Sequence, residues 1–452
     1  TDSYHGGLNQ CYTKGFFKDL TLDYDLVSAY PTLMSCIPRV NMLLPFKEFI
    51  NIKPEEALEK LQDFKEFNLA CAVVDFDFSK VDERYKNHSC IAQKKHNNLV
   101  FTTEGQNVVV SGAELYRALD IGAITKVEKL IIPHYIKDKV FKRFYKKTIK
   151  LRNHFKKMFG KKSVQQEIIK MINNTPYGKT AQGLSKSKIS SYINKIKTSD
   201  NMPSCDLTNP IYATAITSLV RCYLNDVIAL IEEKGYTTHS VTTDGFICNV
   251  TSIDTLDKFT QEDNLLKEFT NKILEIGKDI QNDNNLKSLW EIKHTNEAFF
   301  NITTRGNFAC NNEGVLACAG AKVLKKLSTR DKILHYLLKF DGKCQDKFLK
   351  LTTLSKMLIE NEILSGVYIY KDNFFIEYDG KNIPLLNSVE LTEVFIKNKK
   401  YEVLNFKSRQ PKNIKEYLQF KSLLRKYKNA TYTKEKFYKG IMTLGKKEIN
   451  HI

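Results

Sequence analysis

The sequence is poor in the features that cross-link small secreted domains or anchor a chain in a membrane. Its ten cysteines include no C-x-x-C pair, and none of its nine histidines stands near them at a ligand-like spacing. Neither a zinc ribbon nor a disulfide framework is predicted, and we expect a reducing intracellular compartment. No uninterrupted apolar run reaches the roughly 18 residues that cross a bilayer, which predicts a soluble protein without a membrane partner.

Acidic residues are scarce relative to basic ones. Lys and Arg number 70 against 51 Asp and Glu, which gives a net charge of +19 and favours a polyanionic partner such as nucleic acid. The excess is concentrated, because residues 126–170 hold 15 basic and 3 acidic residues, and residues 397–447 hold 16 and 3. Aromatic residues are interleaved with both clusters, which is typical of folded basic surfaces rather than of disordered tails.

The length of the chain predicts several subdomains. With 452 residues, of which 42% are hydrophobic, the chain can bury a sizeable core, and roughly two to four subdomains in a monomer are expected. Because the chain begins with Thr1 and a recognisable motif starts at Tyr4, we expect an upstream region to precede it.

Local patterns in the first third of the chain predict a strand, a short helix and an inserted sheet. Residues 20–25 alternate between apolar and polar side chains, which predicts a strand with Asp25 at its end. From Ser28 the pattern changes to a short helix that Pro31 opens. Residues 37–134 contain strand-like pieces and predict an insertion with a small sheet of its own.

Two helices are expected after this insertion. Apolar residues recur at three- and four-residue steps through 137–159, which predicts a basic amphipathic helix that Gly160 ends. A second helix over 164–175 would complete a helical hairpin. Pro176 removes a backbone donor and disfavours a helical conformation at Thr175, so the second helix should break there.

A long helix and a tight hairpin are expected further along. Residues 211–233 read as one helix, with Gly235 just past its end as a stop signal. Strands at 239–243 and 246–250 flank an Asp-Gly dipeptide, a strong hairpin signal that places Asp244 at the tip.

Asp25 and Asp244 are candidates for metal-assisted chemistry. Nucleotidyl transfer uses two divalent cations, about 3.5 to 4 Å apart, which carboxylates from different strands hold together. Taken singly, each aspartate is better explained as an ordinary turn or cap residue. The residues around them decide between the two interpretations.

Four short motifs surround these aspartates. Residues 4–7 read Tyr-His-Gly-Gly, 25–31 read Asp-Leu-Val-Ser-Ala-Tyr-Pro, 170–179 read Lys-Met-Ile-Asn-Asn-Thr-Pro-Tyr-Gly-Lys, and 242–245 read Thr-Thr-Asp-Gly. They resemble, in the same order, the Y-x-G-G, D-x-x-S-L-Y-P, K-x-x-x-N-S-x-Y-G and D-T-D-S motifs of family B DNA polymerases. The sequence is similar in particular to the protein-primed branch of that family, found in phages, viruses and linear plasmids.

The resemblance implies an α+β fold, a right-hand polymerase with palm, fingers and thumb, plus insertions between the palm motifs. It implies a template-directed DNA polymerase that extends a primer on a DNA template with deoxynucleoside triphosphates, with a terminal priming protein as a further partner. The family's exonuclease precedes Y-x-G-G and would lie outside this chain. The implied divisions are 1–36 for the first part of the palm, 37–134 for an insertion, 135–180 for the fingers, 181–210 for a second insertion, 211–317 for the palm with its catalytic hairpin, and 318–452 for the thumb and C-terminal region.

Roles for individual residues follow from the same resemblance. Asp25 and Asp244 would be the catalytic ligands of two Mg²⁺ ions, which Mn²⁺ can replace, and Leu26 would lend a backbone carbonyl to a metal. Tyr30 would lie under the sugar and exclude a 2′-hydroxyl, which implies selection of deoxynucleotides. Contacts with the template strand or its channel are implied for Tyr4, Gly6, Gly7, Ser28 and Lys179.

The middle motif also has a physical rationale of its own. On a helix, Lys170, Asn174 and Tyr177 stand at i, i+4 and i+7 and share one face. This face presents a cation to the phosphates of an incoming nucleotide, an amide to its polar edges, and a ring to its base or sugar. The alternative interpretation is a surface helix with a tyrosine packed at its end.

The primer-gripping K-x-Y element of the family has two candidate matches. Arg305-Gly-Asn-Phe308 has the expected position and keeps one cation and one aromatic residue. Lys436-Phe-Tyr438 matches the letters better but lies close to the end of the sequence. We place Arg305 first and keep Lys436 and Tyr438 as further candidates for DNA contacts.

One departure from the family keeps rival functions open. Thr242 stands where most members have the first aspartate of D-T-D-S, although Asp244 retains the ligand. Asp23, on the same strand face as Asp25, is either a spare carboxylate or a solvated strand residue. The rivals are a catalytically impaired DNA-binding replication scaffold and a reverse transcriptase, whose hairpin carries paired aspartates. A nuclease is disfavoured, because no further carboxylates cluster near either catalytic aspartate in the sequence.

Overall fold

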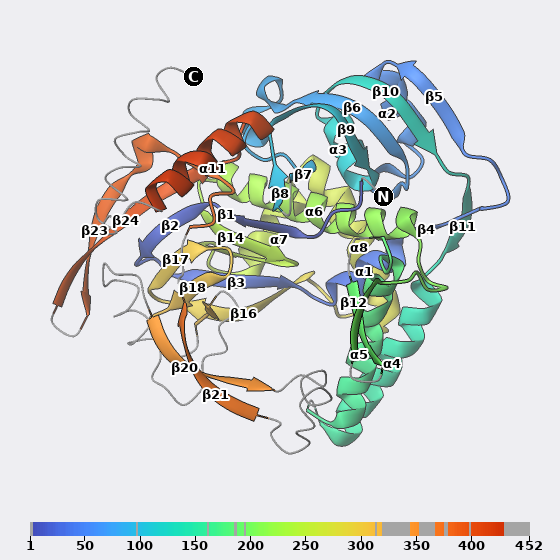
Figure 1. The fold of residues 1–452 in the computed structure, drawn as a ribbon. Helices are drawn as coiled ribbons and strands as arrows, with labels where there is room; N and C mark the ends of the chain where they lie inside the picture. Colours follow the sequence, from blue (N-terminus) through green and yellow to red (C-terminus); the bar gives the residue numbers. More distant parts are fainter. Residues whose placement is uncertain are drawn as a thin grey trace.

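The computed structural model describes most of the chain. The described residues are 3–95, 98–160, 162–184, 188–193, 196–311, 314–318, 344–351, 367–374, 378–396 and 399–428. Helices and strands follow one another in irregular order, so the fold class is α+β, as the resemblance implies. Figure 1 shows sheets in the middle of the molecule, a further sheet at the upper right, and a helical pair at the lower right.

Five strands from distant parts of the sequence form an antiparallel central sheet in the order β1-β14-β15-β3-β16. The sheet therefore brings three of the four sequence motifs together. The strand predicted over 20–25 is confirmed with a shift of one residue, and both strands of the predicted hairpin are present. The strands are β1 (Leu8–Cys11), β3 (Thr21–Leu26), β14 (Thr238–Thr243), β15 (Gly245–Cys248) and β16 (Trp290–Asn296).

Helix α6 (Pro210–Glu233) forms the centre of the hydrophobic core, and the helix predicted over 211–233 is confirmed. Its side chains share one buried cluster with Tyr24 and Phe246 of the sheet. The Asn209 side chain caps it by accepting two backbone N–H bonds, at 3.1 and 3.2 Å. Within the described residues, α6 is the one helix whose length and composition would suit a membrane span, and its most apolar window is wholly buried inside the structure.

The small sheet expected within residues 37–134 is present. Its four antiparallel strands run in the order β5-β10-β6-β9, and apolar residues such as Phe76, Leu115 and Leu130 give it a buried cluster of its own. Helix α1, which carries the end of the first catalytic motif, precedes it. The elements are α1 (Ala29–Cys36), β5 (Lys47–Ile52), α2 (Pro54–Leu61), β6 (Cys71–Asp77), β9 (Glu104–Ser111), α3 (Gly112–Asp120) and β10 (Ile124–Ile132).

The predicted helical pair consists of α4 (Lys142–Phe159) and α5 (Val164–Thr180). Gly160, with a φ of 87°, ends α4 as expected. The predicted start at residue 137 is wrong, because β11 (Tyr135–Lys139) pairs there with β4 (Pro38–Val40). Backbone pairing to a distant strand thus overrides the local helical periodicity.

The prediction that Pro176 ends the second helix is wrong, because α5 continues through it to Thr180. Two hydroxyl groups support the last turns: Thr175 donates to the carbonyl of Met171, and Thr180 to that of Tyr177, each at 2.7 Å. The Tyr177 ring is also held by tertiary contacts. The tertiary stack of Tyr177 on Tyr30 works against the cost of a proline inside a helix, about 3 kcal/mol.

A second sheet lies beside the central one, at the left of Figure 1. It runs β19-β18-β17-β2-β24-β22, with β23 beside β24, and so joins early and late parts of the chain. The Asn405 side chain secures this junction by bonding both the N–H and the carbonyl of Phe16 at 2.8 Å. The strands are β2 (Thr13–Phe17), β17 (Phe299–Thr303), β18 (Gly306–Ala309), β19 (Leu316–Cys318), β22 (Ile383–Pro384), β23 (Glu390–Ile396) and β24 (Lys399–Arg409).

The remaining elements are hairpins and peripheral helices. Each hairpin is a separate two-stranded sheet. Helices α7 and α8 pack against each other and on the central core. The elements are β7 (Ala92–Lys95), β8 (Asn98–Phe101), β12 (Lys188–Ile193), β13 (Ile196–Asn201), α7 (Ile253–Glu262), α8 (Asn264–Gln281), β20 (Cys344–Leu351), β21 (Val367–Phe374) and α11 (Ile414–Lys428).

Candidate active site

Asp25 and Asp244 come from neighbouring strands of the central sheet. In the register between β3 and β15, Asp25 lies opposite Gly245, the residue that follows Asp244. The backbone N–H of Leu26 donates to the carbonyl oxygen of Asp244 at 3.0 Å. The two predicted catalytic residues, distant in sequence, therefore lie side by side. Leu26, whose backbone carbonyl oxygen is predicted to bind a metal, is next to both.

The tip of the catalytic hairpin differs from the predicted Asp-Gly turn. Thr242 pairs with Gly245, so the two loop residues are Thr243 and Asp244. Thr243 has a φ of 61°, and the N–H of Asp244 donates to the carbonyl of Thr242 at 2.7 Å. A bond between residues i and i+2 across a positive φ is typical of a γ-turn, a strained conformation. The turn places Asp244 at the tip.

Gly245 belongs to the strand because β15 approaches β3 very closely at this point. A Cβ atom on Gly245 would lie 2.3 Å from Oδ1 of Asp25 and 2.5 Å from the carbonyl oxygen of Tyr24. A residue with a side chain would push the two strands apart or displace the Asp25 carboxylate. A glycine is therefore needed here to leave room for the Asp25 carboxylate, and not to form the turn.

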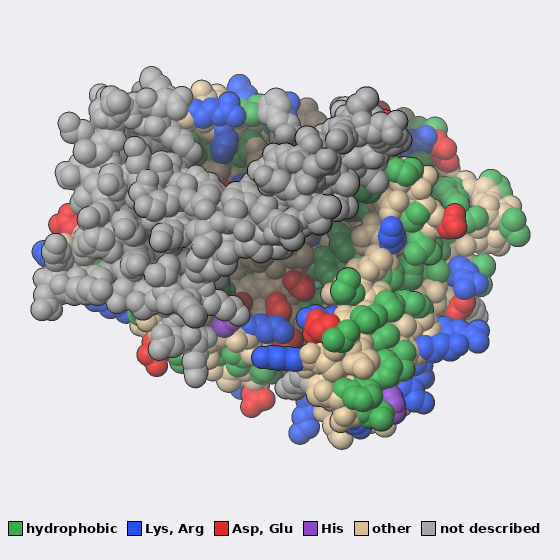
Figure 2. Space-filling model, turned by 60° about the horizontal axis from the view of Figure 1, so that its bottom comes forward, with side chains coloured by type: hydrophobic (Ala, Val, Ile, Leu, Met, Phe, Trp, Pro, Cys, Tyr) green, Lys and Arg blue, Asp and Glu red, His purple; other side chains and the backbone are tan. Residues whose placement is uncertain are grey.

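The two carboxyl groups are partly buried and repel each other. Burial, followed by the charge of Asp244, raises the pKa of Asp25 to about 6, and burial raises the pKa of Asp244. The Nζ atom of Lys293 lies 3.6 Å from Oδ2 of Asp25 and offsets part of this repulsion. Figure 2 shows acidic and basic side chains next to each other at the edge of the hollow in this face.

This arrangement fits divalent cations that arrive with a phosphate-bearing substrate. Mg²⁺ is commonly held by one or two carboxylates together with substrate phosphates. Asp25 and Asp244 supply two carboxylates whose mutual repulsion a cation would relieve. No group of three or more His, Cys, Asp or Glu side chains among the described residues could hold a metal by itself.

Asp23 is neither a solvated strand residue nor a free carboxylate. Its Oδ2 atom lies 2.7 Å from Nδ1 of His294 on β16. Burial raises the pKa of Asp23, and the contact with His294 acts in the opposite direction. Asp23 shares the strand face of Asp25, but its carboxylate is already engaged by a neighbouring side chain.

Three tyrosines from separate motifs gather beside Asp244. The rings of Tyr30 on α1 and Tyr177 on α5 stack with centroids 4.4 Å apart and an interplanar angle of 24°. Burial, and then the charge of Asp244, raises the pKa of Tyr30 to about 12. Tyr4 hydrogen-bonds to Tyr177 and contributes to raising the pKa of that residue, which burial raises most. The stack fixes the Tyr30 ring near the Asp244 carboxylate.

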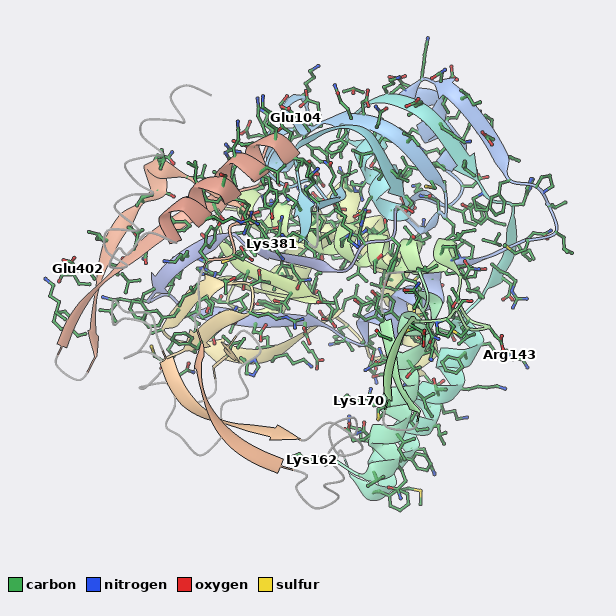
Figure 3. The ribbon with its side chains drawn as sticks, in the orientation of Figure 1. Glu104, Arg143, Lys162, Lys170, Lys381 and Glu402 are labelled. Atoms are coloured by element: carbon green, nitrogen blue, oxygen red, sulfur yellow. The ribbon has the colours of Figure 1, made fainter. Side chains whose placement is uncertain are left out.

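The remaining residues of the middle motif lie on the same continuous helix. Lys170 and Asn174 are exposed, and Tyr177 is half-buried at the inner end of their face. The Nζ atom of Lys170, labelled in Figure 3, lies 3.6 Å from Oε2 of Glu167, and both side chains are about half exposed. Such surface pairs contribute little, so the Lys170 ammonium group can exchange this partner for another anion.

The other predicted DNA contacts occupy varied positions. Ser28 has a left-handed backbone, with a φ of 51°, at the start of α1. Lys179 donates to the side chain of Gln182 at 2.6 Å. Lys436 and Tyr438 lie outside the described residues.

The segment 4–7 is fixed against the catalytic hairpin by a buried arginine of α6. Arg221 is fully buried and donates to the carbonyls of His5 and the following residue at 2.9 and 2.5 Å. Its guanidinium group also bonds both carboxylate oxygens of Glu114 at 2.6 and 2.8 Å. A Cβ on Gly7 would lie 3.1 Å from the Cα of Thr243. The segment thus packs directly on the turn before Asp244.

Arg305 is exposed in the turn between β17 and β18, which lies next to the catalytic hairpin. The hydroxyl of Thr242 donates to the carbonyl of Thr304 at 3.4 Å and joins the two turns. Phe308 is fully buried in a stack with Phe300. The cation of the proposed primer-gripping element is therefore accessible, and its aromatic partner is a core residue.

Sequence reasoning missed several residues of this site. Lys293 and Glu291 lie on β16, where Glu291 is opposite Asp25. No local sequence pattern shows that β16 pairs with β3, so neither residue could be assigned to the site. The sequence did contain a hint of the Arg221–Glu114 ion pair, namely the arginine. A lone arginine inside an apolar helix is rarely buried without a partner, and its position could have marked a buried ion pair.

Comparison with known proteins places this geometry in a family. A family model described as DNA polymerase type B, organellar and viral, matches residues 1–271. A curated relative, the primer-independent DNA polymerase PolB of Escherichia coli, is 25% identical over 402 residues, which cover 84% of this chain and 42% of the relative. The chain thus spans less than half the length of that relative.

Solved structures of phi29 DNA polymerase share the fold. The ternary complex with primer-template DNA and incoming nucleotides has a TM-score of 0.51 at 13% identity, and the match covers 83% of this chain and 61% of that chain. An orthorhombic crystal form gives a TM-score of 0.50 at 13% identity, covering 83% and 62%. With the family model matching more than half of its residues, the chain belongs to the type B DNA polymerases of the organellar and viral kind.

Proposed function

We propose that this chain is a template-directed DNA polymerase that adds deoxynucleotides to a primer 3′-hydroxyl by two-metal nucleotidyl transfer. The single observation that carries the proposal is the convergence of Asp25 and Asp244 on adjacent strands, beside the stacked Tyr30 and Tyr177. In this proposal the central sheet is the palm, α4 and α5 are the fingers, and residues 318–452 contain the thumb.

Each residue has a task in the proposed reaction. Asp25 and Asp244 would hold the divalent cations, which would supply a lower pKa for the 3′-hydroxyl and positive charge to balance the triphosphate. Lys170 binds the phosphates of the incoming nucleotide through charge-assisted hydrogen bonds. The Tyr30 ring, fixed by Tyr177, occupies the space that a 2′-hydroxyl would need.

Primer extension tests the proposal. A primed DNA template is incubated with Mg²⁺ and either deoxy- or ribonucleotides, and the same primer is annealed to RNA in a parallel reaction. Extension by deoxynucleotides on DNA, lost in Asp25→Ala with DNA binding retained, is the expected result. Asp63→Ala, which changes an exposed aspartate of the inserted segment, is the matched control.

Other outcomes identify the rival functions. Template binding without extension in either Mg²⁺ or Mn²⁺ would make the chain a replication scaffold. Extension on RNA as efficient as on DNA would make it a reverse transcriptase. Undiminished synthesis by Asp25→Ala would remove the two-metal assignment.

We extend the proposal to initiation without a nucleic-acid primer. The motifs resemble those of protein-primed polymerases, and the curated relative is named primer-independent. Labelled nucleotides supplied with an unprimed single-stranded template should give product in the presence of Mg²⁺. A terminal protein as primer would leave the label protein-linked and dependent on that partner. No product under either condition would restrict the chain to primed templates.

A further inference from the structure

The hairpin of β7 and β8 belongs to the inserted segment by sequence but packs on the central core. Ala92 and Phe101, which lie opposite each other in the hairpin, are buried in the cluster that contains α6 and the central sheet. Neither side chain belongs to the cluster of the inserted sheet. The hairpin is therefore an arm that reaches from the inserted unit to α6, as Figure 1 shows.

The face of the hairpin that carries the buried Ala92 and Phe101 also carries a lysine near the tip. Side chains alternate along a strand, so Lys94 follows Ala92 on this face, and Leu99 lies opposite Lys94. Leu99 is partly buried against the central cluster, whereas Lys94 is exposed. Lys95, the next residue, points to the opposite face.

One face of α6 holds both the chain leading into the hairpin and segment 4–7: Asn225 donates to the carbonyl of His88 at 2.7 Å, and Arg221, one helical turn earlier, donates to the carbonyl of His5 at 2.9 Å. Burial, Arg221 and then the charge of Lys94 lower the pKa of His5 to about 3, so His5 is neutral at physiological pH. In the described part of the chain no carboxylate forms an ion pair with Lys94. Some lysines of the inserted segment do form ion pairs, as Lys86 does with Glu83 at 2.6 Å.

The inserted segment carries almost no net charge, so the position of Lys94 beside segment 4–7 is what sets this lysine apart. Residues 37–134 contain 13 basic and 14 acidic residues, although the whole chain carries +19. The segment as a whole is therefore no general DNA-binding surface. An exposed cation beside the polymerase motif Tyr-His-Gly-Gly is a local feature that suits a single phosphodiester group.

We propose that the Lys94 face of the β7 and β8 hairpin binds the single-stranded DNA template next to segment 4–7. Lys94 contacts a backbone phosphate, and Leu99 contacts an unpaired base or its sugar. A partly exposed apolar side chain beside a cation suits unstacked bases, which a duplex does not offer. This inference rests on the proposed function, which makes segment 4–7 part of the template channel.

Binding measured without metal or nucleotide tests the inference. Fluorescence anisotropy compares a primer–template duplex that has a 5′ template overhang with a blunt duplex of the same paired sequence. Lys94→Ala should weaken binding to the overhang DNA about three- to tenfold and leave the blunt duplex unchanged. On the overhang DNA, the slope of log Kd against log salt concentration should decrease by about 0.7, the value for one phosphate of a single strand. Lys94→Arg should restore both values.

Lys95→Ala is the matched control, because it removes the same charge from the other face of the same hairpin. It should leave both affinities unchanged. The inference is overturned if Lys94→Ala weakens both DNAs equally or neither, or if Lys95→Ala matches its effect on the overhang DNA. Because the assay needs no catalysis, an overhang-specific loss in a chain that fails to extend primers would keep this inference and remove the proposed function.

Discussion

At Asp25, the fold that buries the side chain also brings the Asp244 carboxylate close, and both effects disfavour the charged form. Lys293, 3.6 Å away, acts in the opposite direction. The carboxylate pair is therefore more easily ionised with a divalent cation than without one. The motifs identified both aspartates, whereas the pKa of Asp25 depends on burial and neighbours that only the folded chain shows.

A pH dependence of metal binding follows at this scale. The pKa of Asp25 is raised from 3.8 to about 6 in the folded chain. Protonation of Asp25 therefore stabilises the metal-free fold, and this contribution is complete below the pKa of Asp25 in the unfolded chain. This contribution is lost as pH rises through about 6. Metal binding needs the ionised form, so the Mg²⁺ concentration for half-maximal thermal stabilisation should rise up to about tenfold per pH unit below 6 and level off above it. Thermal denaturation with Mg²⁺ titrations from pH 5 to 8 measures this, and a flat profile would contradict it.

Sugar discrimination should depend on the Tyr30 ring. Tyr30→Ala removes the ring that stacks 4.4 Å from Tyr177 and should lower the preference for deoxy- over ribonucleotides at least tenfold, a change of about 1.4 kcal/mol. Tyr30→Phe keeps the ring and should keep the preference. Steady-state kcat/KM values for both nucleotide types give the ratio. An unchanged ratio in Tyr30→Ala would make Tyr30 a core residue.

At the scale of elements, local patterns succeeded where local forces dominate. The alternation in β3, and the long helical stretch of α6 with Gly235 just past its end, located both elements. The break expected at Pro176 did not occur, because the tertiary stack of Tyr177 on Tyr30 holds the last turn of α5. The Asp-Gly turn was misplaced by one residue, since Gly245 is required by the approach of β3 and not by the turn.

Gly245→Ala should damage the site through β3. Its Cβ would lie 2.3 Å from Oδ1 of Asp25, so the strands must separate or the carboxylate must move. We expect a loss of about 1 to 3 kcal/mol in the free energy of unfolding and a larger loss of extension activity. Gly277→Ala, inside α8, is the control, because the nearest atom to its Cβ would be a side-chain methyl group of Leu286, at 3.3 Å. Chemical denaturation and primer extension report the two effects, and a fully active Gly245→Ala would refute the positioning role.

At the scale of the whole molecule, the site is assembled from segments that no local pattern connects. The family motifs point to Asp25, Tyr30, Lys170 and Asp244 as candidates because these residues have recognisable neighbours in the sequence. Lys293 could not be found in this way, since its position depends on the pairing of β16 with β3. The basic clusters indicated a polyanionic partner, but composition alone does not say where a cluster lies in the fold.

The salt dependence of DNA binding should reflect the basic surface of α4. Replacing Lys150, Lys156 and Lys157 together by alanine should lower the slope of log Kd against log salt by up to about 0.9 for each phosphate that these lysines neutralise. The same replacement at three exposed lysines of the charge-balanced inserted segment should change it little. Those control lysines are Lys53, Lys60 and Lys80. Equal slopes for wild type and the α4 variant would separate this helix from the DNA path.

The most direct test of the two-carboxylate site is single-nucleotide incorporation on one primed DNA template with Mg²⁺, comparing wild type, Asp244→Asn and Thr242→Ala. An amide cannot supply the negative charge that offsets two cations, so Asp244→Asn should reduce incorporation to background. The Thr242 hydroxyl bonds to the Thr304 carbonyl and carries no charge, so Thr242→Ala should retain most activity. Incorporation by Asp244→Asn at the rate of an active wild type would show that the chemistry lies elsewhere in the chain.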